Sequence, residues 1–111
     1  MNEQAIQEQH QHIITLLEQK RLKEAQSQTE AFLFNSNDWA LRSRLEQVQT
    51  SYQYMLQYMR QGVNDPERQK LYRQLLVETW EIADQTRLNM LDGVSNHYYH
   101  SLRKNRDRLP K

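Results

Sequence analysis

Two histidines near the C-terminal end of the sequence have a spacing that could bind a metal ion. His97 and His100 are three residues apart, so a helix would place both imidazoles on one side. A metal site needs further ligands, and no His-x-x-Glu pair accompanies them. His10 and His12 are two residues apart and fall on different faces of a helix. The sequence therefore predicts no metal ion and no cofactor, and the histidines are expected to be solvated or partly packed.

Three carboxylates, Glu78, Glu81 and Asp84, repeat every three residues and would line one side of a helix. Paired carboxylates can perform acid–base chemistry or hold two metals inside a helical bundle. The bundle site also requires Glu-x-x-His motifs, and the sequence contains none. We expect a solvated acidic face that pairs with Arg87 or with basic residues near the C-terminus.

The segment 98–106 interleaves aromatic and basic residues, a composition used to stack on bases and contact phosphates. Residues 93–111 carry five basic side chains against one acidic one, whereas the whole chain has a net charge of only +1. A structural interpretation is favoured over this one, because basic residues suit helix C-termini and tyrosines can dock a helix. Nucleic-acid binding is thus kept as the alternative function, with these candidate contacts: Tyr98, Tyr99, Arg103, Lys104 and Arg106.

The sequence also lacks the residues that several other kinds of catalytic site require. There are no cysteines, which excludes disulfides, thiolate metal sites and cysteine nucleophiles. With two isolated glycines, the chain has no phosphate-binding glycine loop and no Gly-x-Ser-x-Gly motif. The sequence predicts a protein that is not an enzyme.

Large aromatic side chains exceed what a thin helical core requires. Tyr54 and Tyr58 are four residues apart on a face that adjoins the apolar row of their helix, and Trp80 lies beside another such row. Because tyrosine and tryptophan are enriched where proteins bind one another, these three residues form the candidate partner interface. The alternative is that they widen an ordinary core.

Helices must position all of these residues. The strongest periodic signal is a heptad row that needs an antiparallel neighbour or a dimer partner, and its members are Leu41, Leu45, Val48, Tyr52, Met55 and Met59. Breaks fall at residues 35–38, where Asn37 or Asp38 can cap a helix, at Gly62–Pro66 and at Asp92–Gly93.

These signals predict an all-α fold of about five helices in antiparallel hairpins, either a bundle or a tetratricopeptide-like array. We expect one domain over 1–111, composed of a short hairpin at 1–35, a long hairpin at 38–92 and a C-terminal helix at 95–108. A helix that ends in charges near Lys111 indicates a piece of a longer protein. No signal-peptide pattern and no run of ~20 apolar residues for a membrane span is present. The compartment is open, with the cytoplasm slightly favoured.

Two resemblances accompany these patterns. The segment Ile13–Ala25, with Leu16-Leu17 before a turn and Leu22-x-x-Ala25 after it, resembles half of a tetratricopeptide unit, although it lacks the glycine before the turn. The segment Met55–Arg68 is similar to the N-terminal helical region of large uncharacterised Bacteroidetes proteins, which implies a fragment and carries over no catalytic residue. We therefore expect a non-catalytic interaction or scaffolding module that binds a partner protein or itself.

Overall fold

The computed structural model describes the backbone of residues 2–36, 38–60 and 66–107, and the side chains of 2–36, 38–57 and 66–93. Within these ranges the chain forms four α-helices and no strand, which confirms the all-α prediction: α1 (Glu3–Glu18), α2 (Leu22–Phe34), α3 (Trp39–Arg60) and α4 (Pro66–Asp107). None of the described helices is both long enough and apolar enough to cross a membrane.

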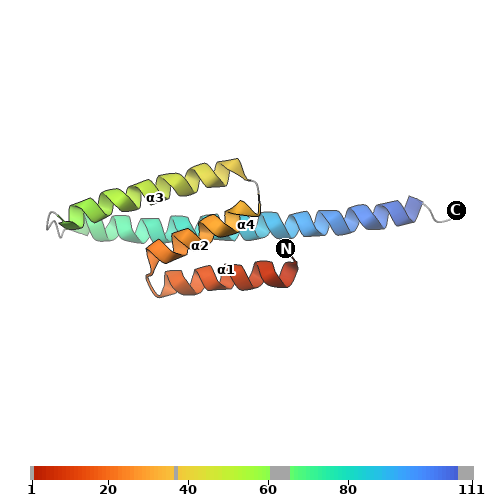
Figure 1. Ribbon diagram of the computed structural model, residues 1–111, viewed down its shortest axis with the longest axis horizontal. Helices are drawn as coiled ribbons and strands as arrows, with labels where there is room; N and C mark the ends of the chain where they lie inside the picture. Colours follow the sequence, from red (N-terminus) through yellow and green to blue (C-terminus); the bar gives the residue numbers. More distant parts are fainter. Residues whose placement is uncertain (1, 37, 61–65, 108–111) are drawn as a thin grey trace.

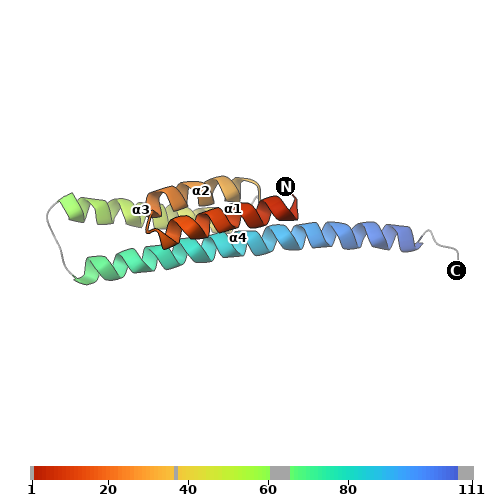
Figure 2. The ribbon, with the colours of Figure 1, turned by 90° about the horizontal axis from the view of Figure 1, so that it is seen from below.

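The 42-residue helix α4 is the spine of the molecule. It packs against α1, α2 and α3, which all lie on one side of it in the view of Figure 2. Helices α1 and α3 run antiparallel to α4, and the last part of α4 extends beyond the other helices (Figure 1). The molecule is accordingly elongated, with extents of 74 × 24 × 19 Å.

The prediction of about five helices with a break at Asp92–Gly93 is wrong. Helix α4 continues through both residues to Asp107, so the expected C-terminal helix at 95–108 is the end of α4. A glycine inside a helix costs only about 1 kcal/mol relative to alanine, which weakens a helix without ending it. No proline follows within the helix to force a stop.

The helix starts follow local capping rules. Asn2 precedes α1, and its side chain accepts a hydrogen bond from the Ala5 N–H at 2.8 Å. Helix α4 begins at Pro66 as predicted, since proline is pre-organised for the first helical position. Gly62, predicted to end the preceding helix, lies outside the described residues.

The turn between α1 and α2 is closed by a lysine rather than a glycine. Lys20 has a φ of 59°, in the left-handed region. The Arg21 N–H donates to the Leu16 carbonyl at 2.9 Å and the Lys20 N–H donates to the Leu17 carbonyl at 3.0 Å, which is the hydrogen-bond pattern of a Schellman motif. Helices α1 and α2 therefore form a tight helical hairpin without the glycine that usually occupies this position.

One hydrophobic core joins the four helices. Its most deeply buried large side chains are Phe32, Ile6, Ile13, Leu22, Leu33, Leu45, Leu75 and Ile82. In the heptad row of α3, Leu41, Leu45, Val48 and Met55 are buried and Tyr52 is half-buried; the Met59 side chain lies outside the described residues. Because α3 packs on α2 and α4 of the same chain, the described part of the row closes within the chain.

Three threonines occupy core positions in the apolar rows. Thr29, Thr79 and Thr86 are fully buried. Each hydroxyl donates to the carbonyl four residues earlier at 2.7 Å, so each of these three buried hydroxyls has a hydrogen-bond partner.

Candidate interaction surface

Two of the three predicted interface residues are exposed. Tyr54 in α3 is 63% exposed and Trp80 in α4 is 45% exposed. Tyr58 belongs to α3, but its side chain lies outside the described residues. The alternative, in which these aromatics widen the core, does not hold for Tyr54, while Trp80 is about half-covered.

Tyr54 and Trp80 do not share a patch. Tyr54 follows the buried Leu45 by nine residues, about two and a half turns, which places it on the opposite side of α3 from the core. Trp80 precedes Arg87 by seven residues, about two turns, and so lies on the side of α4 where Arg87 approaches His10 of α1. The predicted interface is therefore divided between two faces.

A different pair of aromatic rings does come together, at the junction of α2 and α3. Trp39 and Phe34 are 75% and 71% exposed, the two highest values among the large hydrophobic side chains described. The Arg42 Cζ atom lies 5.4 Å from the Trp39 ring centroid and 5.6 Å from the Phe34 ring centroid. Both distances fall within the range of cation–π attraction. We name Phe34, Trp39 and Arg42 the junction cluster.

Asp38 fixes the backbone on which the junction cluster stands. Its Oδ1 accepts from the Leu41 N–H at 3.0 Å, so Asp38 caps α3 as one of the two predicted capping residues. Its Oδ2 accepts from the Asn89 side chain of α4 at 3.0 Å. The carboxylate thus starts α3 at Trp39 and ties that start to the spine. Asn37, the other predicted cap, lies outside the described residues.

The predicted interface does not include Phe34, Trp39 or Arg42. A signal was present in each case. Phe34 is the third apolar residue in succession after Phe32 and Leu33, and a single helix face cannot bury all three. Trp39 lies two residues before Leu41, so it falls outside the row that Leu41 begins.

Two of the three carboxylates in the acidic ladder form ion pairs, one with the predicted Arg87 and one with Arg44, which was not predicted. Arg87 donates to the Asp84 Oδ1 at 2.8 Å, and Glu81 pairs with Arg44 of α3. The His10 Nε2 lies 3.5 Å from the same Asp84 oxygen, without the geometry of a hydrogen bond. Among the described residues no group of three or more His, Asp or Glu side chains could hold a metal ion.

Burial and the nearby Arg87 lower the pKa of His10 below its usual 6.5, and the opposing effect of Asp84 is weaker. The imidazole is therefore neutral at pH 7. The His10 imidazole of α1 thus lies half-buried against the Asp84–Arg87 pair of α4, and its Nε2 forms no hydrogen bond with the described residues.

The candidate nucleic-acid contacts at 98–106 belong to α4, on the part that extends past the other helices (Figure 2). Their side chains, like those of His97 and His100, lie outside the described residues. Nucleic-acid binding by this segment stays a prediction.

Comparisons with protein-family models, curated proteins and solved structures found no significant match for this chain.

Proposed function

We propose that this chain is a non-catalytic helical interaction module that binds a partner protein, or a second copy of itself, through the junction cluster. The observation that carries the proposal is the pairing of two highly exposed aromatic rings around one arginine. Tryptophan and arginine are the side chains that most often dominate binding energy in protein interfaces.

The physical cost of this exposure supports the same conclusion. Apolar surface in water costs roughly 25 cal/mol per Å², and singly exposed hydrophobic residues are common on monomers. Here two exposed rings both lie within cation–π distance of Arg42, and within the described residues Arg42 forms no ion pair with a carboxylate. A partner could cover both rings and supply an acceptor for the guanidinium.

The scaffold is suited to presenting such a surface. Asp38 holds the start of α3 with one hydrogen bond inside the helix and one to α4. The backbone that carries Trp39 is therefore fixed before a partner binds, which reduces the entropy lost on association. The hairpin resemblance of α1 and α2 to a tetratricopeptide unit agrees with a binding role.

The test uses the intact chain with a photo-crosslinking amino acid at Phe34, and the same amino acid at Gln85 as a control on an exposed part of α4. We expect a specific adduct only from position 34. With the captured partner purified, Trp39→Ala should raise the dissociation constant at least about 30-fold, the loss of a 2 kcal/mol hot spot.

Tyr54→Ala serves as the matched variant, since Tyr54 is also exposed but lies on another face of α3. Both variants should keep the melting temperature, because neither side chain is in the core. Partner binding that depends on Tyr54 and not on Trp39 would contradict the proposal and move the interface to the outer face of α3.

A further inference from the structure

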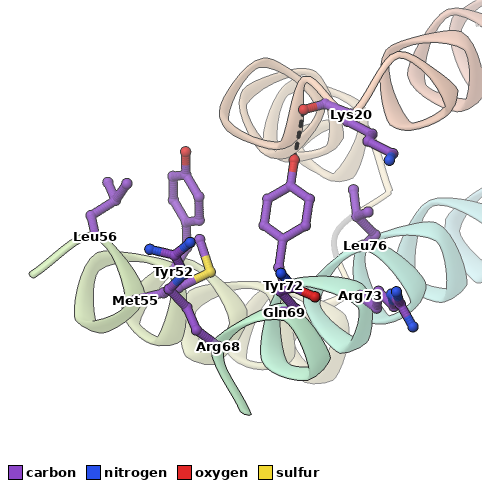
Figure 3. Close-up of a pocket in the computed structure, with 9 residues that line it drawn as sticks. All are labelled: Lys20, Tyr52, Met55, Leu56, Arg68, Gln69, Tyr72, Arg73 and Leu76. Carbon is purple, nitrogen blue, oxygen red and sulfur yellow. Dashed lines mark hydrogen bonds between the residues drawn. The ribbon is translucent and has the colours of Figure 1, made fainter. Parts of the chain in front are cut away.

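A groove opens at the end of the bundle where α3, α4 and the α1–α2 turn meet (Figure 3). Its volume is about 560 Å³, within the range of ligand-binding sites in proteins. Its lining includes the buried Met55 and the half-buried Leu76, and the half-buried rings of Tyr52 and Tyr72 stand side by side in it. The groove therefore offers an apolar interior between two phenol rings.

The rim of the groove is cationic. Lys20 from the turn and Arg73 from α4 both line it and are exposed, and Arg68 lines it as well. No carboxylate is among the described residues that line the groove. Within the described part of the chain neither the Lys20 ammonium nor the Arg73 guanidinium forms an ion pair. At Lys20 and Arg73, positive charge thus borders an apolar interior without an ion pair to any described residue.

The backbone conformation at Lys20 is one that glycine adopts more easily than lysine. Its left-handed φ of 59° suits glycine, which has no Cβ to clash with the backbone. The turn is held from outside as well, because the Tyr72 hydroxyl donates to the Lys20 carbonyl at 2.7 Å. A lysine at this position places an ammonium group at the rim, where glycine would make the turn without one.

The two tyrosine hydroxyls of the groove differ in their hydrogen bonding. Burial and the nearby Tyr52 raise the pKa of Tyr72, so its hydroxyl keeps its proton and its bond to Lys20. The Tyr52 hydroxyl has no hydrogen-bond partner in the described part of the chain, which leaves it able to donate.

We propose that this groove binds an acidic segment of a partner protein, with a carboxylate held by Lys20 and Arg73 and an adjacent apolar side chain between Tyr52 and Tyr72. This inference rests on the proposed interaction function and adds a second contact site with its own chemistry. The charge of the rim selects an anion, and the apolar lining selects a ligand whose charge adjoins a hydrophobic group.

The experiment titrates the intact chain with a fluorescein-labelled, end-blocked peptide of alternating Glu and Leu residues, followed by fluorescence anisotropy. The matched probe replaces every Glu by Gln. We expect the Glu peptide to bind at least about 10-fold more tightly than the Gln peptide, because charge-assisted hydrogen bonds are lost with Gln. Binding of the Glu peptide should weaken as salt is added, since the rim is exposed.

Lys20→Gly and Arg73→Gln should each weaken binding of the Glu peptide about 10-fold, the loss of one charge-assisted contact. Lys70→Gln, an exposed residue on the same helix that does not line the groove, should leave it unchanged. Lys20→Gly should not lower the melting temperature, because glycine suits the left-handed turn. A loss of binding in this variant therefore cannot come from unfolding.

Equal affinity for the Glu and Gln peptides, or full binding by both groove variants, would overturn the inference. So would an oligonucleotide that binds with the same dependence on Lys20 and Arg73, since the site would then recognise phosphate. Trp39→Ala should not affect binding of the Glu peptide. If the Glu peptide does not bind but a partner protein still binds in a Trp39-dependent way, only this inference is refuted. If the Glu peptide binds but no partner protein depends on Trp39, only the proposed role of the junction cluster is refuted.

Discussion

At the scale of single residues, His10 links pH to folding. The pKa of its half-buried imidazole is lowered, first by burial and then by Arg87, so the unfolded chain binds this proton at a higher pH than the folded chain does. Stability from this group is fully present above the unfolded pKa of about 6.5 and is lost as the pH falls through that value toward the folded pKa.

We predict that His10→Gln makes the free energy of unfolding less dependent on pH between about 7.5 and 5.5, the window around the unfolded histidine pKa. Urea denaturation followed by circular dichroism at several pH values measures this. The matched control is His12→Gln, two residues away and exposed, which should keep the wild-type slope. Parallel stability curves for wild type and His10→Gln would show that His10 is not the group responsible.

At the scale of elements, Gly93 tests the continuity of α4. It is exposed inside the helix, and apart from its chain neighbours and the nearby backbone of the helix itself, no atom lies within 4 Å of the position that a Cβ would occupy. Gly93→Ala should therefore stabilise the surrounding helix by about 0.5–1 kcal/mol, because alanine loses less backbone entropy than glycine.

Hydrogen exchange of the amides in the turns on either side of residue 93 is the appropriate measurement, since it reports local opening. We expect slower exchange in Gly93→Ala, and no change in Gln85→Ala, which replaces an exposed residue that already favours helix. Faster exchange after Gly93→Ala would indicate that the glycine ends a helix in solution.

At the scale of the whole molecule, α4 holds the other three helices together. Ile82 is fully buried near the middle of the region where α1, α2 and α3 pack on it. Ile82→Ala should lower the free energy of unfolding by about 2–5 kcal/mol, through lost burial and a residual cavity. Domains of this size have only about 5–15 kcal/mol in total, so the effect on denaturant midpoint should be large.

Val77→Ala provides the comparison, because Val77 lies on the same helix and is 53% exposed. Its effect should stay within about 0.5 kcal/mol, as is usual for surface positions. Equal effects of the two substitutions would mean that α4 is not the spine of a shared core.

The sequence by itself determined the helical class, the helix starts at Asp38 and Pro66, and most of the buried heptad row of α3. These features depend on interactions within a few residues of the chain: side-chain oxygens that cap backbone N–H groups, and apolar residues at three- and four-residue spacings. The one large error in the predicted fold is the break at Gly93. A glycine costs a helix too little free energy to end it without further signals.

Only the tertiary structure decided where surfaces and sites lie. Tyr54 and Trp80 have similar sequence signals but face different sides, because the position of each depends on which helices pack beside its own. The junction cluster depends on a hydrogen bond between Asp38 and Asn89, and one wall of the groove depends on a bond between Tyr72 and the Lys20 carbonyl. Each bond joins residues more than fifty positions apart, a distance over which local periodicity carries no information.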